Sequence, residues 1–229
     1  MHTLKLILIS MTLICTFNAH AVSSASGGEP QFNPQQIAEF AKKVERAMAA
    51  KGARVVIISR VGRPASELPK GFRYTHTAFA VYSMIKTADG RQVPGYVMYN
   101  LYQDDENPDR SKLVKDFPVD FFASVYELKA GLIIPSAKLQ QRLLQVIASD
   151  AYQRLHEPRY SAIASPFNLG YQNCTEHTLD VINAAIYQTD NIQNIKSNTR
   201  SYFKAQRVRV NPLKLALGSV FKEDIATSD

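Results

Sequence analysis

The pattern of apolar and polar residues predicts two amphipathic helices, one near the start of the chain and one past its middle. After Asn33, an N-cap candidate followed by a proline, apolar residues recur at helical spacing until Gly52. A second helix is expected to begin after the cap Ser136 and to run through Ala148. The predicted buried faces are Ile37, Phe40, Ala41, Val44 and Met48 in the first helix, and Leu139, Leu143, Leu144 and Ile147 in the second.

The segments between these helices are rich in β-branched and aromatic residues and predict strands. Residues 54–61 form one strand, and THTAFAVYSMI and VPGYVMYNLYQ form a hairpin around the turn signal Ala88-Asp89-Gly90. Residues 104–111 are expected to be a polar turn, and residues 119–135 a short helix or strand followed by an extended segment. The fold class predicted is α+β, with an antiparallel sheet packed by helices.

The first residues have the pattern of an export signal. Lys5 precedes the apolar run LILISMTLICTF, and Ala19-His20-Ala21 ends it with the small residues typical of a cleavage site. The run is too short for a membrane span, and Ile14 before Cys15 does not fit a lipidation site. We expect a signal peptide over 1–21, a flexible leader over 22–31 and a single domain over 32–229, located in the periplasm or secreted.

Charge adds a candidate binding surface. The chain carries a formal net charge of +7, and residues 196–222 contain seven basic residues and no acidic one. In an exported protein such a segment favours anionic lipid or cell-wall polymers over nucleic acid. The chain after the helix that begins at Cys174 is expected to be a polar loop, a strand at QRVRV and a short helix after Pro212.

After removal of the signal peptide, Cys174 is the single cysteine, so no intramolecular disulfide can form. A helix is expected to start here, with Asn173 as N-cap, Glu176 completing a capping box, and Leu179, Ile182 and Ile186 facing inward. The N-terminal amides and the helix dipole should lower the pKa of the Cys174 thiol and could hold an oxyanion. A buried structural cysteine fits the same position.

A nucleophilic cysteine needs a base, normally histidine. His177 is on the same helix, where side chains three residues apart rarely align for proton transfer, and we expect it to be partly exposed; His156 receives no role. His76 begins a strand whose face also carries Ala78 and Ala80, a shallow surface that a helix bearing Cys174 could approach. A strand-edge histidine bonded to a carbonyl is the structural alternative.

A third polar group usually orients a catalytic imidazole. If the hairpin turns at Asp89, residue 76 lies opposite 102 and 78 opposite 100, which makes Asn100 a diagonal neighbour of His76. A register slip would bring Gln103 there instead, so Gln103 is the reserve candidate.

Other site chemistries lack their motifs. Cys174, Glu176 and His177 offer ligand atoms without the second pair that a zinc site needs, so no metal is expected. The chain has no CxxCH haem attachment motif, no G-x-S-x-G elbow and no P-loop, and no cofactor is expected.

The order of a histidine opening a strand (YTHTAFAVY), a polar residue on the next strand (Asn100) and a cysteine at a helix start (YQNCTEHTLDVINAA) resembles the circularly permuted papain-like hydrolases. This group includes NlpC-like and lecithin retinol acyltransferase-like proteins. Most of the chain after the signal also resembles a family of exported bacterial proteins classed as a domain of unknown function.

The resemblance implies a thiol hydrolase or acyltransferase that acts on an amide or ester, often in peptidoglycan or lipid. Cys174 would be the nucleophile, His76 the base and Asn100 the orienting group, with the Cys174 amide and the Gln172 side chain at the oxyanion. The alternative is a non-catalytic envelope protein that binds anionic lipid or cell wall through the basic segment.

Overall fold

The computed structural model describes residues 31–205. The predicted signal peptide, most of the predicted leader, the predicted strand QRVRV and helix after Pro212, and the basic residues from Arg207 onward lie outside these residues. Within them no helix is long and apolar enough to span a membrane.

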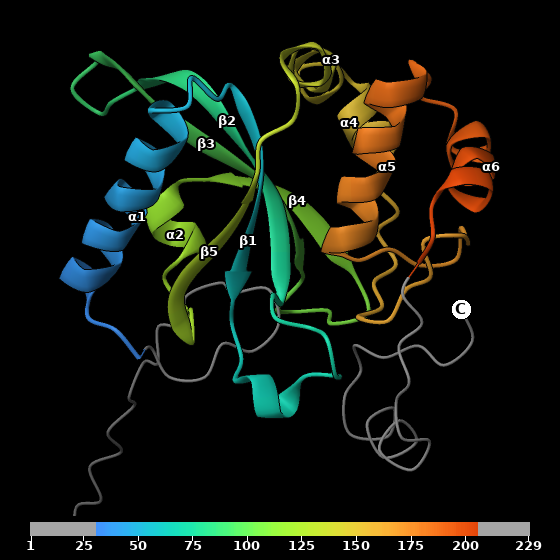
Figure 1. Cartoon of the computed structure of the whole chain (residues 1–229), viewed down its shortest axis with the longest axis horizontal. Coiled ribbons are helices and arrows are strands. Elements are labelled where there is room, and N and C mark those ends of the chain that lie inside the picture. Colours follow the sequence, from blue (N-terminus) through green and yellow to red (C-terminus); the bar gives the residue numbers. More distant parts are fainter. Residues whose placement is uncertain (1–30, 206–229) are drawn as a thin grey trace, which may run out of the picture.

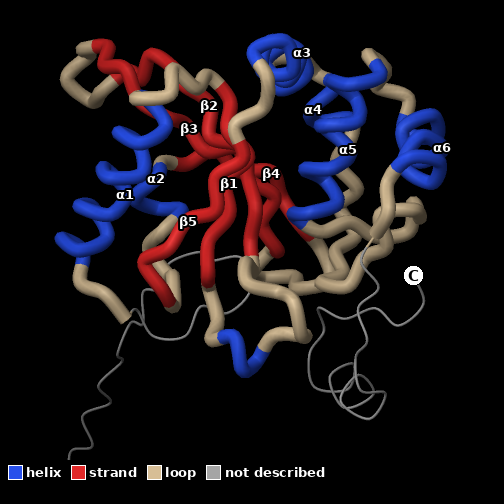
Figure 2. The backbone as a smooth tube through the Cα atoms, viewed as in Figure 1, coloured by secondary structure: helices blue, strands red, loops and turns tan. Residues whose placement is uncertain are grey.

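A five-stranded antiparallel sheet in the order β4-β3-β2-β1-β5 forms the centre of the molecule (Figures 1 and 2). This architecture confirms the predicted α+β class with an antiparallel sheet packed by helices. The strands are β1 (Val55–Val61), β2 (His76–Lys86), β3 (Gln92–Gln103), β4 (Ser111–Asp116) and β5 (Glu127–Ile133). The helices are α1 (Pro34–Ala49), the 3-10 turn η1 (Ala65–Glu67), α2 (Pro118–Phe121), α3 (Ala137–Ile147), α4 (Ala151–Arg154), α5 (Cys174–Tyr187) and α6 (Ile192–Tyr202).

The two faces of the sheet are covered by different helices, because successive residues of a strand point to opposite sides. Ala78 and Ala80 of β2 pack with α1 and α2, in a cluster that includes Val44 and Phe121. Phe79 and Val81 pack with α3, α5 and α6 on the other face. Figure 1 shows α1 and α2 on one side of the strands and α3 to α6 on the other.

The helices predicted from amphipathic spacing are confirmed. Asn33 caps α1 through a reciprocal bond with Gln36, and Gly52 follows the helix with a positive φ of 61°. Ser136 accepts a hydrogen bond from the Leu139 amide at the start of α3. The predicted hairpin is also confirmed: Phe79 pairs with Tyr99 and Lys86 with Gln92, which is the register that a turn at Asp89 gives.

Three elements differ from the sequence prediction, the first being the short helix α4, which lies where a loop was expected after Ala148. The segment 111–116 forms β4, which pairs with β3 as the edge strand of the sheet. Its sequence SKLVKD carries too few apolar residues to indicate a strand. The segment 192–202, expected to be a loop, is the helix α6, which Asn191 caps through its side chain.

Candidate functional site

His76 is the first residue of β2 and is almost fully buried. Its Nε2 lies 3.1 Å from Oδ1 of Asn100 on β3. The hairpin register explains this contact, since it makes residue 100 the diagonal neighbour of residue 76. The structure therefore brings together two of the three residues predicted for the catalytic group.

The hydrogen bonds of Asn100 continue into β4. Nδ2 of Asn100 donates to Oδ1 of Asp116 at 2.7 Å, and the Tyr102 hydroxyl donates to Oδ2 of the same carboxylate at 2.8 Å. Because the carboxylate can only accept, the amide of Asn100 is oriented with its oxygen toward His76. The neutral imidazole then carries its proton on Nε2, which leaves Nδ1 with the lone pair that can accept a proton.

Aromatic rings enclose His76. The Tyr102 ring stacks on it at 5.0 Å between centroids, and the Phe121 ring lies at 5.6 Å. Burial, together with the charge of Arg60, lowers the pKa of His76 to about 3, so the imidazole is neutral at ordinary pH. Burial raises the pKa of Asp116 to about 6, although bonds from Tyr102 and Asn100 oppose that rise.

Arg60 is the cationic residue of this cluster. It pairs with His76 across β1 and β2 and is buried. Its guanidinium carbon lies 5.8 Å from the centroid of the Tyr102 ring and 5.2 Å from that of Phe121, and Nη1 donates to the Phe121 carbonyl. Burial lowers the pKa of Arg60, while electrostatic interactions with Tyr102, Asp116 and Cys174 raise it by less.

Cys174 is the first residue of α5 and is half-buried. Asn173 caps the helix as predicted, since its side chain accepts from the Glu176 amide at 3.0 Å. The expected lowering of the thiol pKa is wrong: burial raises the pKa of Cys174. Interactions with the Thr77 backbone and with Thr175, together with the charge of Arg60, lower this pKa by less than burial raises it.

The approach of α5 to the sheet also differs from the expectation. The shallow face with Ala78 and Ala80 belongs to α1 and α2, whereas α5 packs on the face of Phe79 and Val81. Cys174 reaches β2 at Thr77, directly after His76 in sequence. The pairing of β2 with β3 begins two residues further along, at Phe79 and Tyr99. Because strand residues alternate in direction, the His76 side chain lies with Ala78 on the face of Phe121, opposite the face that α5 covers.

Gln172 is held inside the domain by its own hydrogen bonds. Nε2 donates to the Leu155 carbonyl and to Oδ2 of Asp180, each at 3.0 Å, and Oε1 accepts from the Glu157 amide at 2.9 Å. Both amide hydrogens are thus used, and the geometry does not support the expected contact with an oxyanion.

The reserve candidate Gln103 donates to the Pro108 carbonyl at 2.7 Å and lies on the opposite face of β3 from Asn100.

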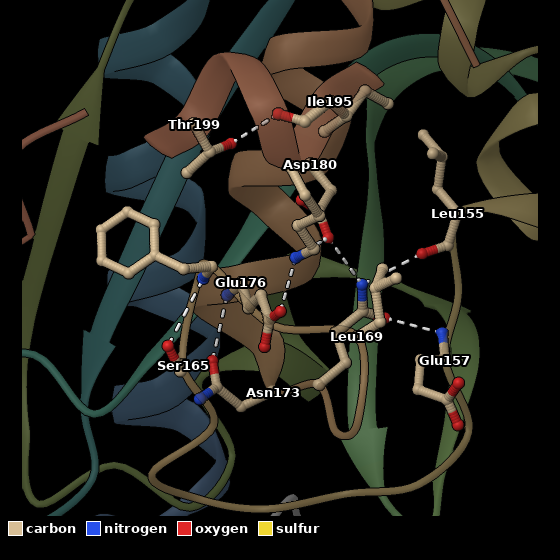
Figure 3. A network of polar contacts seen from close by, with 12 residues as sticks. Leu155, Glu157, Ser165, Leu169, Asn173, Glu176, Asp180, Ile195 and Thr199 are labelled. Atoms are coloured by element: carbon tan, nitrogen blue, oxygen red, sulfur yellow. Dashed lines mark hydrogen bonds and ion pairs between the residues drawn. The ribbon is translucent and has the colours of Figure 1, made fainter. Parts of the chain in front are cut away.

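Glu176 and Asp180 of α5 form a buried ionic network with Lys196 of α6 (Figure 3). Nζ of Lys196 lies 2.6 Å from Oε1 of Glu176 and 2.9 Å from Oδ2 of Asp180. The Glu176 carboxylate is therefore an ion-pair partner and not the second half of a capping box. His177 is buried against Tyr152 instead of being partly exposed. Burial lowers the pKa of His177 to about 3.

No role was expected for His156. Its Nε2 lies 2.9 Å from the hydroxyl of Ser111, the first residue of β4. Three residues of the His76 cluster, Arg60, Tyr102 and Asp116, are not predicted from the sequence. A charged residue within the apolar strand VVIISRV was the available signal for Arg60.

In the described part of the chain, no group of three or more His, Cys, Asp or Glu side chains could hold a metal ion.

No curated protein and no solved structure matches the chain. One family model does match it, over residues 47–229, which is most of its length. The chain belongs to the family described as an uncharacterized protein conserved in bacteria (DUF2145).

Proposed function

We propose that this protein is an exported thiol hydrolase or acyltransferase with the residue arrangement of a permuted papain-like enzyme. The proposal rests on the buried hydrogen-bonded chain from Asp116 through Asn100 to His76, which leaves Nδ1 of His76 as the accepting nitrogen. Cys174 interacts with the backbone of Thr77, the residue after His76 in β2, and with the charge of Arg60, which pairs with His76 across the sheet. Its substrate would be an amide or ester, such as cell-wall peptide or lipid.

The pKa shifts favour a mechanism that starts from neutral groups. Burial disfavours both the Cys174 thiolate and the protonated His76, so no ion pair is expected before substrate binds. As sulfur attacks the carbonyl carbon, Nδ1 of His76 takes the thiol proton. The leaving amine or alcohol then departs with that proton and a thioester remains on Cys174, which water or an acceptor alcohol cleaves.

The amides at the N-terminus of α5 are the candidate donors to the oxyanion, because they are oriented along the helix axis and do not all have partners. The positive charge of Arg60 would stabilise the same developing negative charge, since it already interacts with Cys174. Asn100 would keep the imidazole in its productive tautomer.

The test is acylation of the purified chain by a p-nitrophenyl ester, in a Cys15→Ser background that leaves one thiol. We expect a covalent acyl adduct on Cys174 by mass spectrometry, none in Cys174→Ala, and a rate at least ~100-fold lower in His76→Ala. The matched control His156→Ala removes a histidine that bonds Ser111 and should retain the rate. Equal rates in His76→Ala and the parent would reject the proposal.

The alternative function is binding through the basic segment 196–222, and one basic residue of that segment is buried in the fold. Lys196 is buried between Glu176 and Asp180 and cannot contact a membrane or cell wall. We therefore favour the enzyme, and expect any binding to anionic liposomes to depend on residues beyond Lys196 and to weaken with salt.

A further inference from the structure

A cavity that Cys174 does not line lies beside the N-terminal halves of α5 and α6. It has a volume of about 250 Å³ and is bounded by the segment 154–172. Its floor is formed by the buried residues Leu155, Gln172, Glu176, Asp180 and Lys196. The exposed residues Arg154, Asn168 and Leu169 form its rim, so the cavity opens to solvent.

The charges around this cavity do not balance. The lining contains three carboxylates, Glu157, Glu176 and Asp180, and two cations, Arg154 and Lys196, which leaves one negative charge in excess. At the rim, Arg154 pairs with Asp190 and Glu157 pairs with Arg159. Among the charged residues that line the floor, Lys196 is paired with the two buried carboxylates of Glu176 and Asp180.

One oxygen on this floor lacks a donor. Oδ2 of Asp180 accepts from Lys196 and Gln172, but Oδ1 has no hydrogen-bond partner within residues 31–205. Asp180 has no exposed surface, and its burial raises the pKa of the carboxyl despite the ion pair with Lys196. A buried carboxylate oxygen without a donor is unfavourable by about 1–3 kcal/mol or more, so a bound donor would be favoured here.

We propose that this cavity binds a small ligand with a protonated amine or guanidinium group on a short aliphatic body. The cationic group would donate to Oδ1 of Asp180 and neutralise the excess charge. The aliphatic part would contact Leu155, Leu169 and Ile192, which line the same cavity. A volume of about 250 Å³ lies below the range of roughly 300–1,000 Å³ for drug-sized ligands, so the ligand is small.

The site does not depend on the thiol chemistry. Cys174 does not line the cavity, and the residues that do are held by the Lys196 network rather than by the His76 cluster. Binding is therefore expected to persist in Cys174→Ala, whatever becomes of the acylation experiment.

The test compares four probes of similar size and different charge by amide NMR on the full chain. We expect n-butylammonium and n-butylguanidinium to shift the Leu155, Gln172 and Asp180 amides saturably, whereas 1-butanol and butyrate do not. The amide of Gly90, in the distant hairpin turn, should stay unchanged. Absence of saturable shifts with both cations, or equal shifts with butanol, would overturn the proposal.

Two variants sharpen this test. Asp180→Asn should weaken binding of both cations at least about tenfold, or 1.4 kcal/mol, because it removes the charge and keeps the size. The matched control Asp190→Asn removes an exposed carboxylate near the rim and should leave binding within twofold. An equal loss in both variants would contradict binding at Asp180. If Asp180→Asn does not fold, the selectivity among the four probes decides.

Discussion

At the scale of single residues, Arg60 influences both members of the proposed proton-transfer pair. It lies opposite His76 in the sheet and over the same two aromatic rings, Tyr102 and Phe121. A buried positive charge disfavours a second positive charge and favours a negative one. Arg60 accordingly lowers the pKa of His76 and also lowers that of Cys174.

Removal of this charge should raise both pKa values. In Arg60→Gln we expect the thiol pKa, measured from the pH dependence of iodoacetamide alkylation in a Cys15→Ser background, to lie above that of the parent. The His76 pKa, followed by NMR of the imidazole, should rise as well. Arg60→Lys keeps the charge and should restore most of both values.

Disruption of the fold would produce a different result. An unfolded chain would bring the thiol pKa down toward the ordinary ~8.5 while the His76 pKa rose toward ~6.5. Opposite movements of the two values would therefore show loss of structure, and only a parallel rise supports the electrostatic role of Arg60.

The sequence could predict the contact of His76 with Asn100 because one turn signal at Asp89 determines the register of the whole hairpin. It could not predict Asp116, since the strand that carries it has a weak apolar pattern and owes its place to pairing with β3. The thiol pKa was predicted wrongly for a similar reason. The helix dipole is visible in the sequence, whereas the burial that outweighs it depends on how α5 packs.

At the scale of elements, α5 differs from the other long helices in what it buries. The predicted inward residues are poorly buried, and Ile186 is exposed, whereas Val181, Ala184 and Ala185 face the sheet. Helices α3 and α6 cover further sides of α5, so polar residues of α5 are buried as well. The apolar spacing located α1 and α3 because each has one buried face, but a helix enclosed on several sides loses that signal.

The stability of α5 should depend strongly on Lys196, which lies on α6. Lys196→Met leaves two buried carboxylates without their cation, and we expect a loss of about 3–5 kcal/mol in the free energy of unfolding. Urea denaturation measures this loss. The control Lys204→Met removes an exposed lysine just after α6 and should change stability by less than ~0.5 kcal/mol.

A second variant separates charge from packing. Adding Glu176→Gln and Asp180→Asn to Lys196→Met removes all three charges, and this triple variant should recover part of the lost stability. If it is as unstable as Lys196→Met alone, the loss comes from packing of the lysine side chain and not from unpaired charge.

At the scale of the whole molecule, buried titratable groups oppose one another as the pH falls. His76 and His177 have pKa values lowered from 6.5 to about 3, so the unfolded chain binds protons there that the folded protein does not. Their contribution to stability is present above pH 6.5 and is lost as the pH falls toward 3. Asp116 acts in the opposite sense, because its pKa is raised from 3.8 to about 6.

The folded Asp116 carboxyl keeps its proton between pH 3.8 and 6 while the unfolded one does not, so acidification through this window adds stability and offsets one histidine. Asp116→Asn removes that offset. We expect the variant to lose stability more steeply than the parent between pH 6 and 4, by up to about 1.4 kcal/mol per pH unit. Below pH ~3.8 the unfolded carboxyl is protonated too, so the two proteins should lose stability in parallel. Urea midpoints measured at half-unit intervals of pH test this, and equal slopes between pH 6 and 4 would show that Asp116 is ionised in the folded protein throughout that window.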